Sequence, residues 1–283
     1  MRILVTGSDG FIGKKLTQEL KNLGHEVLPF DLSSGNDICS WSSVSTIQHI
    51  DMIYHLAAIS FVPFSYEQPG KMYNVNVHGT MNILELARQR GAKLVFMSSY
   101  VYGQPDYLPI DEKHPLKPFN PYCQSKILGE QLCEAYHRDF NVPIMIFRPF
   151  NIYGYGQRPE FLIPLIIEQV SQGEVSLKDP RPKRDYIHVD DVVSAMIKAS
   201  SLSFGYETLN LGSGISYSVK EVVEILLESS EKNVEVSYLN EFRKNEVLDT
   251  IANIEKTSHY LSWKPEIDFR TGIAEFIELM EKL

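Results

Sequence analysis

Tyr122 and Lys126 stand four positions apart in the stretch NPYCQSK, directly after an Asn-Pro pair. Asn is a favoured helix N-cap and Pro fits the first helical position, so the stretch predicts the start of a helix. Residues four apart lie on one helix face, which would place the phenol beside the ammonium. Two readings follow: an exposed pair at a helix start, or a phenol whose pKa is lowered by a neighbouring cation so that it can act as a base.

Composition and charge narrow the classes of protein that could use such a pair. The 283 residues include 27 basic and 36 acidic side chains, which gives a formal net charge of −9. This balance argues against a nucleic-acid or polybasic membrane-binding surface, so no nucleic-acid or membrane partner is expected. Cys39, Cys123 and Cys133 are odd in number and lack the spacing of metal ligands, which predicts reduced thiols and no metal site. With no signal-peptide pattern and no apolar run of membrane-spanning length, we expect a cytoplasmic protein.

The order of apolar and helical patterns predicts the architecture that positions these residues. Apolar runs such as RILVT, EVLPF, DMIYHLA, KLVFMS and VPIMIF alternate with helical patterns as far as residue 150. Strands separated by helices form βαβ units with a parallel sheet, so the expected fold class is α/β with a doubly wound parallel sheet. After Asn151 the pattern changes to a loop rich in Tyr, Gly and Pro, a short helix near residues 162–172 and smaller elements. This change indicates a smaller C-terminal region at the ligand edge of the sheet.

A glycine loop between the first strand and the first helix indicates a dinucleotide site. Gly7, Gly10 and Gly13 in ILVTGSDGFIG suit a tight turn, a closely approaching pyrophosphate and a helix packed on a strand. Their G-x-x-G-x-x-G spacing is looser than the G-x-G-x-x-G form. Asp31 follows the second strand, where a carboxylate meets the adenosine ribose, although it could also be only the cap of a turn. Because this carboxylate would repel the 2′-phosphate of NADP and no Arg follows in DLSSGND, we predict NAD as the cofactor.

With these residues in hand, the chain resembles an extended short-chain dehydrogenase/reductase of the NAD-dependent epimerase/dehydratase family, which acts on nucleotide sugars. The motifs TGSDGFIG, NDI, HLAA, NVHGT, SSYVYG, PYCQSK, RPFNIYG and RDYIHVDD follow that family's order, and FRKNEV and LSWKPEIDFRTGI resemble its closing segments. On this reading, residues 1–150 form a Rossmann NAD-binding domain to which 186–212 return, while 151–185 and 213–283 form the nucleotide-sugar-binding domain.

The resemblance also implies a set of cofactor-binding residues along the first domain. They are Gly7, Gly10, Phe11, Ile12, Gly13, Asp31, Asp37, Ile38, Leu56, Ala57, Ala58, Asn76, Tyr122 and Lys126. For Asn76, a helix-start cap is the competing reading. His55, within HLAA, is expected to pack against its neighbours rather than to catalyse.

In this family the tyrosine of Y-x-x-x-K is the catalytic base, the lysine binds the nicotinamide ribose and depresses the tyrosine pKa, and a Ser or Thr completes the set. Lowering a tyrosine pKa from about 10 to about 7 takes roughly 4 kcal/mol. A cation about 5 Å away at an effective dielectric of about 20 supplies roughly 3 kcal/mol, and oxidised nicotinamide adds a second positive charge. Counting four residues back from Tyr102 reaches Ser98, which we expect to bond the sugar oxygen and Tyr122, with Ser99 as the rival assignment.

For the substrate, the resemblance implies a nucleotide diphosphate sugar whose phosphates are held by Arg184 and Arg243. The other substrate-binding residues that it implies are Ser60, Ser99, Tyr100, Asn151 and Leu162. The stretch LKDPRPKRDY replaces a more usual Gly-Asp-Gly sequence, so the base stays open, and Arg181 and Lys183 would either meet an anionic sugar or face water. Family members are often dimers through the Tyr122 helix and its predecessor, so a homodimer is expected by analogy.

The residues after Ser98 help to choose among the reactions of this family. Its dehydratases typically carry Asp-Glu after the catalytic hydroxyl and its decarboxylases a Glu, whereas Ser99 and Tyr100 offer no carboxylate. We therefore predict an NAD-dependent nucleotide-sugar epimerase, with a 4-epimerase acting through a transient 4-keto sugar as the leading case. The alternative is a reductase of 4-keto sugars that consumes NADH or NADPH. A dinucleotide-sensing binding protein is disfavoured, because a sensor has no use for the Ser98, Tyr122 and Lys126 set.

Overall fold

The computed structural model describes residues 1–241 and 246–282, and these form two compact units. Unit 1 consists of residues 1–103, 115–149 and 193–209, and unit 2 of residues 104–114, 150–192 and those from 210 onward. The division differs from the expected one in that residues 104–114, 150, 186–192 and 210–212 belong to unit 2. The first of these segments joins unit 2 because Ile110 N donates to Ile251 O at 2.7 Å and Asn253 N donates to Ile110 O at 2.8 Å.

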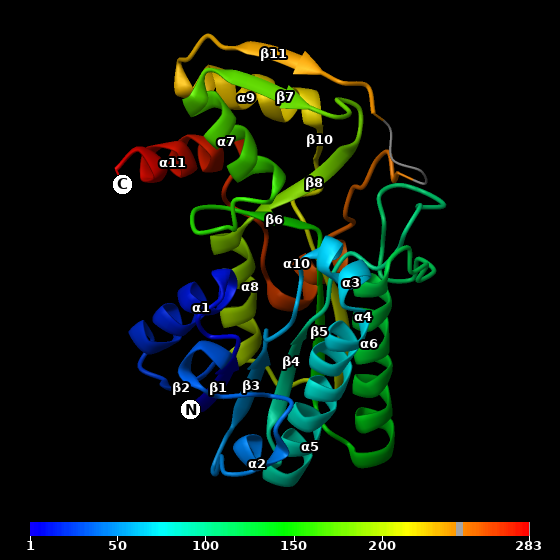
Figure 1. Cartoon of the computed structure of the whole chain (residues 1–283). Coiled ribbons are helices and arrows are strands. Elements are labelled where there is room, and N and C mark those ends of the chain that lie inside the picture. Colours follow the sequence, from blue (N-terminus) through cyan, green and yellow to red (C-terminus); the bar gives the residue numbers. More distant parts are fainter. Residues whose placement is uncertain (242–245, 283) are drawn as a thin grey trace. The chain divides into compact units, whose positions relative to one another are not determined.

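Unit 1 alternates strands and helices along the chain (Figure 1). Its elements are β1 (Arg2–Thr6), α1 (Phe11–Asn22), β2 (Glu26–Phe30), α2 (Trp41–Val44), β3 (Met52–His55), α3 (Val62–Glu67), α4 (Pro69–Tyr73), α5 (Thr80–Arg90), β4 (Lys93–Met97), α6 (Pro121–Phe140) and β5 (Ile144–Pro149). A 3-10 turn (Leu32–Ser34) follows β2, and a π-helical turn (Asn74–Gly79) joins α4 to α5. Two further elements, α8 (Val189–Ser200) and β9 (Tyr206–Leu211), run from one unit into the other.

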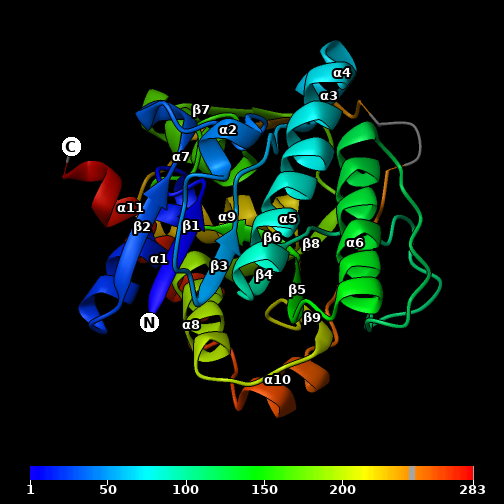
Figure 2. The same ribbon diagram turned by 90° about the horizontal axis from the view of Figure 1, so that it is seen from below.

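The strands of unit 1 form a sheet in the order β2-β1-β3-β4-β5-β9, and the pairings from β2 to β5 are parallel. Ile53 lies in the core cluster that contains Leu84 of α5, whereas the next residue, Tyr54, donates to Met196 O of α8 at 2.7 Å. Because successive strand residues point to opposite faces, helices cover both faces of the sheet (Figure 2). The predicted doubly wound parallel sheet is confirmed, and it brings the carboxyl ends of β1 to β5 to one edge.

Unit 2 is built from short strands and helices around its own apolar core. Its elements are β6 (Asn151–Tyr153), α7 (Leu162–Gln172), β7 (Glu174–Leu177), β8 (Lys183–His188), β10 (Ser216–Ser218), α9 (Val219–Ser230), β11 (Glu235–Tyr238), α10 (Glu255–Leu261) and α11 (Phe269–Glu281). The core gathers α7, α9 and α11, with Ile166, Val222 and Ile273 buried in it. Asp185 of β8 is fully buried and accepts hydrogen bonds from Ser213 N, Gly214 N and Ala252 N, so one carboxylate ties three segments together.

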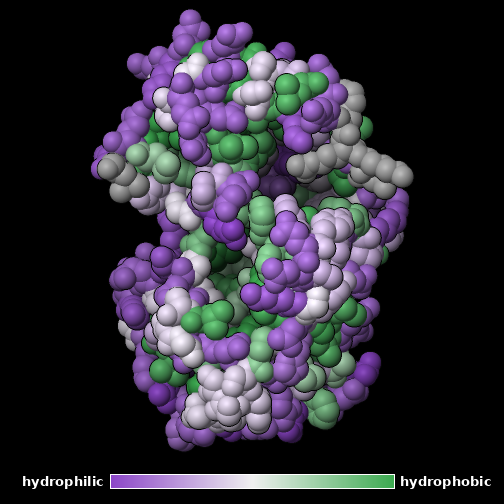
Figure 3. Space-filling view, viewed as in Figure 1, coloured by the Kyte–Doolittle hydropathy of each residue, from purple (hydrophilic) through white to green (hydrophobic). Residues whose placement is uncertain are grey.

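The helices of the described ranges are all too short or too polar to span a membrane. On the face shown in Figure 3, hydrophilic residues predominate and apolar ones are scattered among them.

Candidate functional site

The glycine loop after β1 is packed so tightly that side chains would not fit. Gly7 has φ +71°, and a Cβ there would lie 2.7 Å from Ala57 N, while a Cβ at Gly13 would lie 2.0 Å from Gly7 O. Gly7 N donates to Phe30 O at 2.8 Å, which fastens the loop to the end of β2. The loop therefore lies among the carboxyl ends of β1, β2 and β3, the edge at which ligands bind in such sheets.

Asp31 connects the glycine loop with the turn after β2. Its Oδ1 accepts a hydrogen bond from Ser33 N at 2.9 Å, and its Oδ2 accepts one from Asp9 N at 3.1 Å. Burial raises the pKa of Asp31, but these backbone hydrogen bonds outweigh burial and leave the pKa below its usual value. Asp31 thus caps a turn, as the competing reading held, and also presents an ionised carboxylate beside the glycine loop. Asp9 adds a second carboxylate there, which accepts a hydrogen bond from Ser33 Oγ.

These residues fit a dinucleotide. Next to Gly7, the Ser8 Oγ is buried without a hydrogen-bond partner among the described residues. A buried, unpaired hydroxyl is costly unless a ligand completes it, so a pyrophosphate oxygen would suit Ser8. Asp31 lies where a carboxylate reaches the adenosine ribose.

The other predicted cofactor residues of the first 60 positions lie in three short segments. Leu56, Ala57 and Ala58 follow β3, and Leu56 N donates to Thr6 O of β1 at 3.1 Å. Ile38 is buried, and a Cβ on Gly79 would lie 2.5 Å from its Cδ1. Asp37 Oδ1 accepts a hydrogen bond from Cys39 N. Phe11 and Ile12 are the first two residues of α1.

His55 lies in the sheet between two threonines. Its Nδ1 is 2.8 Å from Thr6 Oγ1 and its Nε2 is 2.9 Å from Thr80 Oγ1. Burial, together with the positive charge of Lys126, lowers the pKa of His55 to about 3. The ring is therefore neutral and saturated with partners, which supports the structural reading.

Asn76 lies in the π-helical turn and bonds two segments instead of capping a helix. Its Oδ1 accepts a hydrogen bond from Ile59 N at 2.8 Å. Its Nδ2 donates hydrogen bonds to Ile59 O at 3.0 Å and to Ser125 Oγ at 2.9 Å. Ser125 Oγ in turn donates to Tyr122 O at 2.7 Å. Asn76 therefore fixes the first turn of α6 relative to the segment after β3, and the cap reading is wrong.

The helix predicted from NPYCQSK is present as α6. The Asn120 side chain caps the helix by accepting a hydrogen bond from Cys123 N at 2.7 Å, and Pro121 is the first helical residue. Gly129 lets the helix approach β4, since a Cβ there would lie 2.7 Å from Phe96 Cζ. Lys126 is only 4% exposed, and its Nζ donates to Met97 O at 2.7 Å. The reading of an exposed surface pair is therefore wrong.

Burial disfavours the charged forms of both members of the pair. It lowers the pKa of Lys126 to about 8. It raises the pKa of Tyr122, and a hydrogen bond with the Ser99 side chain opposes this rise. The depressed tyrosine pKa that the resemblance implied is therefore not a property of the protein alone, because burial leaves the pKa of Tyr122 above its usual value.

The two serines at the end of β4 have different partners. Ser98 N continues the ladder to Phe147 O at 2.8 Å, and Ser98 Oγ donates to Glu130 Oε1 at 2.5 Å. A hydrogen bond with the Ser99 side chain opposes the rise in the pKa of Tyr122. Tyr122 and Glu130 stand two helical turns apart on one face of α6, so both serines face that helix. The assignment of the catalytic hydroxyl to Ser98, with Ser99 as the rival, therefore stays a prediction.

The predicted substrate residues lie in both units. In unit 1, Ser60 is exposed and the Tyr100 hydroxyl donates to Gly103 O at 2.5 Å. In unit 2, Asn151 donates to Asp185 O at 3.2 Å, and Leu162 opens α7.

Arg184, one of the two predicted phosphate ligands, has carbonyl and carboxylate partners. It donates to Val247 O at 2.6 Å and forms an ion pair with Glu246, which the sequence analysis missed although it stands within FRKNEV. Arg243 lies outside the described residues. In the unusual loop before Arg184, the Arg181 guanidinium is bound by Asp179 at 2.9 Å.

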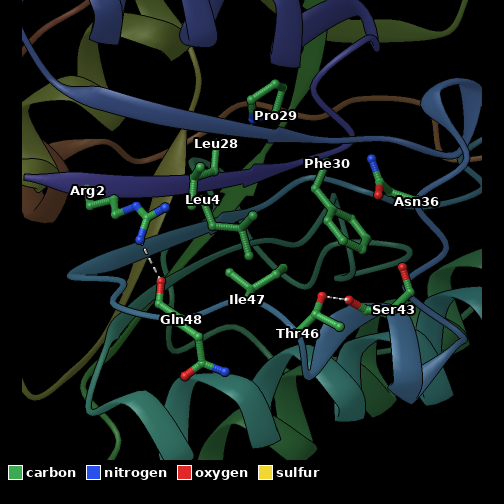
Figure 4. A pocket seen from close by; sticks show the side chains of 10 residues that line it. All are labelled: Arg2, Leu4, Leu28, Pro29, Phe30, Asn36, Ser43, Thr46, Ile47 and Gln48. Carbon is green, nitrogen blue, oxygen red and sulfur yellow. Dashed lines mark hydrogen bonds between the residues drawn. The ribbon is translucent and has the colours of Figure 1, made fainter.

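A pocket of about 390 Å³ lies beside β2 and does not coincide with these residues (Figure 4). Its lining includes Leu28, Phe30 and Ile47, and Arg2 closes one side by donating to Gln48 O at 2.9 Å. None of the predicted catalytic or cofactor residues lines it. Within the described part of the chain, no group of three or more His, Cys, Asp or Glu is placed to hold a metal ion.

Known proteins and solved structures resemble the chain over almost its whole length. Residues 3–212 match the model of the NAD dependent epimerase/dehydratase family. A putative UDP-glucose 4-epimerase of Methanocaldococcus jannaschii is 34% identical, over 99% of this chain and 98% of that protein. A GDP-6-deoxy-D-mannose reductase of Pseudomonas aeruginosa is 28% identical, over 96% and 94%. The solved structure of MoeE5 with UDP-glucuronic acid and NAD has a TM-score of 0.92 and 31% identity, over 100% and 99%. The chain therefore belongs to the NAD-dependent epimerase/dehydratase family.

Proposed function

We propose that the chain is a 4-epimerase of UDP-sugars that uses NAD and passes through a transient 4-keto sugar. The observation that carries this proposal is the start of α6, which places Tyr122 one turn before the buried Lys126, with no carboxylate at positions 99 and 100. A dinucleotide sensor would not need a phenol one turn from a buried ammonium. The UDP moiety is supported by the relatives and structures described above, most of which are named for it.

The residue types after β4 argue against the other reactions of the family. The dehydratases and decarboxylases of the family carry carboxylic side chains after the catalytic hydroxyl, where they can act as acid or base in the loss of water or carbon dioxide. In this chain position 99 supplies a hydroxyl, and the Tyr100 hydroxyl already donates to Gly103 O at 2.5 Å. The keto sugar would therefore rotate in the site and take the hydride back on the opposite face of the same carbon.

In the proposed mechanism, unit 1 holds the cofactor and unit 2 the nucleotide. The glycine loop and Asp31 would bind NAD, which supplies reversible hydride exchange with the sugar carbon. Tyr122 takes the proton from the 4-hydroxyl of the sugar as that carbon is oxidised and gives it back on reduction. Ser98, or its rival Ser99, would donate a hydrogen bond to the same oxygen, and Lys126 would bind the nicotinamide ribose. Over one cycle, no proton and no electron is gained or lost.

The nucleotide diphosphate would be bound by residues of unit 2. We propose Arg184 and Arg243 for the diphosphate, with Asn151 and Leu162 near the nucleotide. Because Glu246 now pairs with Arg184, a bound diphosphate would have to compete with that carboxylate. Arg181 is bound by Asp179, which leaves its charge less available to an anionic sugar.

A panel of UDP-, GDP-, CDP- and dTDP-sugars tests the proposal. The purified enzyme should interconvert one pair of UDP-sugars that differ at C4, without consuming added cofactor. In deuterated water the product should carry no solvent deuterium at C5, because dehydration would exchange that position and epimerisation does not. A stable 4-keto product, released carbon dioxide or stoichiometric oxidation of NADPH would contradict the proposal. The last outcome would favour the reductase, the function of one relative described above.

We also propose that the protein is a cytoplasmic homodimer. A groove of about 590 Å³ along the π-helical turn, α5 and α6 is almost wholly apolar, with Val77, Met81 and Leu132 in its lining. Such a surface suits a second copy of the chain. Met81→Glu should shift the molar mass in multi-angle light scattering to that of a monomer, whereas Met280→Glu, at a methionine of similar exposure on α11, should not. Cell fractionation tests the location.

A further inference from the structure

The turn of the glycine loop carries two polar side chains with opposite exposure. Gly10 N donates to Gly7 O at 3.1 Å, so Ser8 and Asp9 are the central residues of this turn. Ser8 is 3% exposed and its Oγ has no hydrogen-bond partner among the described residues, whereas Asp9 is exposed. A buried hydroxyl without a partner indicates that a ligand completes the turn. Asp9 therefore lies on the solvent side of a loop that is suited to a ligand.

The Asp9 carboxylate bonds the turn that follows β2. Its Oδ2 accepts a hydrogen bond from Ser33 Oγ, and Ser34 Oγ lies 3.5 Å from the same oxygen. Ser33 also donates its backbone N–H to Asp31 Oδ1 at 2.9 Å, and Asp9 N donates to Asp31 Oδ2 at 3.1 Å. Because the two carboxylates share Ser33 as a partner, they lie within roughly 8 Å of each other, about one Debye length at physiological salt. A charge that approaches one of them is therefore felt by the other.

In the described part of the chain, no cation pairs with either carboxylate. Asp9 and Asp31 form no ion pair there, and Lys14, an exposed residue in the first turn of α1, acts on Asp31 only through its charge. The Ser33 hydroxyl proton is already donated to Asp9. The turn after β2 therefore presents an incoming phosphate with two negative charges, and the Ser33 hydroxyl is occupied.

NAD and NADP differ at the 2′ position of the adenosine ribose, which the sequence assigns to Asp31. NAD has a hydroxyl there that can donate to a carboxylate, whereas NADP has a phosphate with about two negative charges. Because Coulomb repulsion acts over a distance, Asp9 need not touch the ribose to disfavour that phosphate. We propose that Asp9 is a second determinant of the preference for NAD over NADP, adding its charge to that of Asp31. The proposal concerns cofactor binding alone, so it does not depend on the sugar or on the reaction.

Asp9→Asn tests the charge, because the amide keeps a side-chain oxygen that can accept from Ser33. Displacement of bound radiolabelled NAD by unlabelled NAD or NADP measures both affinities on the full chain without turnover. At low salt we expect the affinity for NADP to rise about tenfold and the affinity for NAD to stay within about twofold of wild type. Asp9→Glu, which keeps the charge, should retain the wild-type preference.

Glu19→Gln is the matched control for the change in net charge. Glu19 is an exposed acid of α1, about two turns beyond the start of that helix and thus roughly 12 Å from it. Both affinities of Glu19→Gln should equal those of wild type. Salt then separates charge from contact, because screening weakens Coulomb repulsion. The difference in NADP affinity between wild type and Asp9→Asn should therefore shrink as the ionic strength is raised.

A second background keeps the role of Asp9 apart from that of Asp31. In Asp31→Asn, the further change Asp9→Asn should raise the affinity for NADP again, and an effect that vanished there would mean that Asp9 acts only through Asp31 and would overturn the proposal. An unchanged ratio of the two affinities in Asp9→Asn, or the same change in Glu19→Gln, would overturn it as well. So would an equal loss of both affinities in Asp9→Asn, since Asp9 would then only hold the loop in place.

Discussion

Removing the Ser99 hydroxyl should raise the pKa of the proposed catalytic base. Burial raises the pKa of Tyr122, and the hydrogen bond from Ser99 opposes that rise. A hydrogen bond to a charged group is worth about 1.5–3 kcal/mol. At about 1.4 kcal/mol per pKa unit, Ser99→Ala should raise the pKa of Tyr122 by about 1–2 units. The phenolate is the active form of a base, so a higher pKa means that more alkaline solution is needed to populate it.

The assay is the pH dependence of kcat at saturating NAD and sugar nucleotide. The acid limb of the Ser99→Ala profile should move upward by about 1–2 units, so that the rate on that limb falls about 10- to 100-fold. Ser99→Thr, which keeps the hydroxyl, should restore most of the wild-type limb. The reasoning would be refuted if the Ser99→Ala limb coincided with that of wild type, or if Ser98→Ala moved the limb further than Ser99→Ala.

The remaining predictions concern the other charged and titrating groups. Tyr122→Phe should abolish most turnover with little change in ligand binding, and near-wild-type rates would exclude Tyr122 as the base. Lys126→Met should slow the reaction and move the acid limb upward, because the phenolate loses its nearest cation. Asp31→Ala should narrow the preference for NAD over NADP in a binding titration, and a wild type that prefers NADP would contradict the assignment. Arg184→Gln should weaken sugar-nucleotide binding by about ten- to a hundredfold with NAD affinity unchanged; equal losses for both ligands would indicate a disturbed fold.

The fold was predictable because its signals are local. The apolar runs RILVT and KLVFMS became the buried central strands β1 and β4, and the Asn-Pro pair at 120 and 121 opened α6. The glycine loop was equally predictable from the sequence, since Gly7 and Gly13 lie where a Cβ would collide with backbone atoms. In each case the physical requirement concerns residues close in sequence or one tight contact.

The roles of individual side chains were less predictable because they depend on partners far away in sequence. Counting from Tyr102 could not show that Ser98 Oγ bonds Glu130, which stands 32 positions further along the chain. The spacing of the tyrosine and the lysine could not show that Lys126 is buried, with its Nζ over the Phe96 ring and bonded to Met97 O. A carboxylate four residues after a lysine of Y-x-x-x-K was the signal for Glu130.

Burial favours the neutral form of both the tyrosine and the lysine, which their spacing in the sequence does not suggest. Taken from water, a phenolate and an ammonium are both disfavoured, so the pKa of Tyr122 rises while that of Lys126 falls to about 8. In the protein alone, the neutral phenol is therefore the stable form of Tyr122 near neutral pH. A positive charge brought to about 5 Å would stabilise the phenolate by roughly 3 kcal/mol at an effective dielectric of about 20, which is close to two pKa units. Oxidised nicotinamide carries that charge and reduced nicotinamide does not, so the base strength of Tyr122 should follow the oxidation state of the cofactor, and a phenol in a site without NAD should hold its proton.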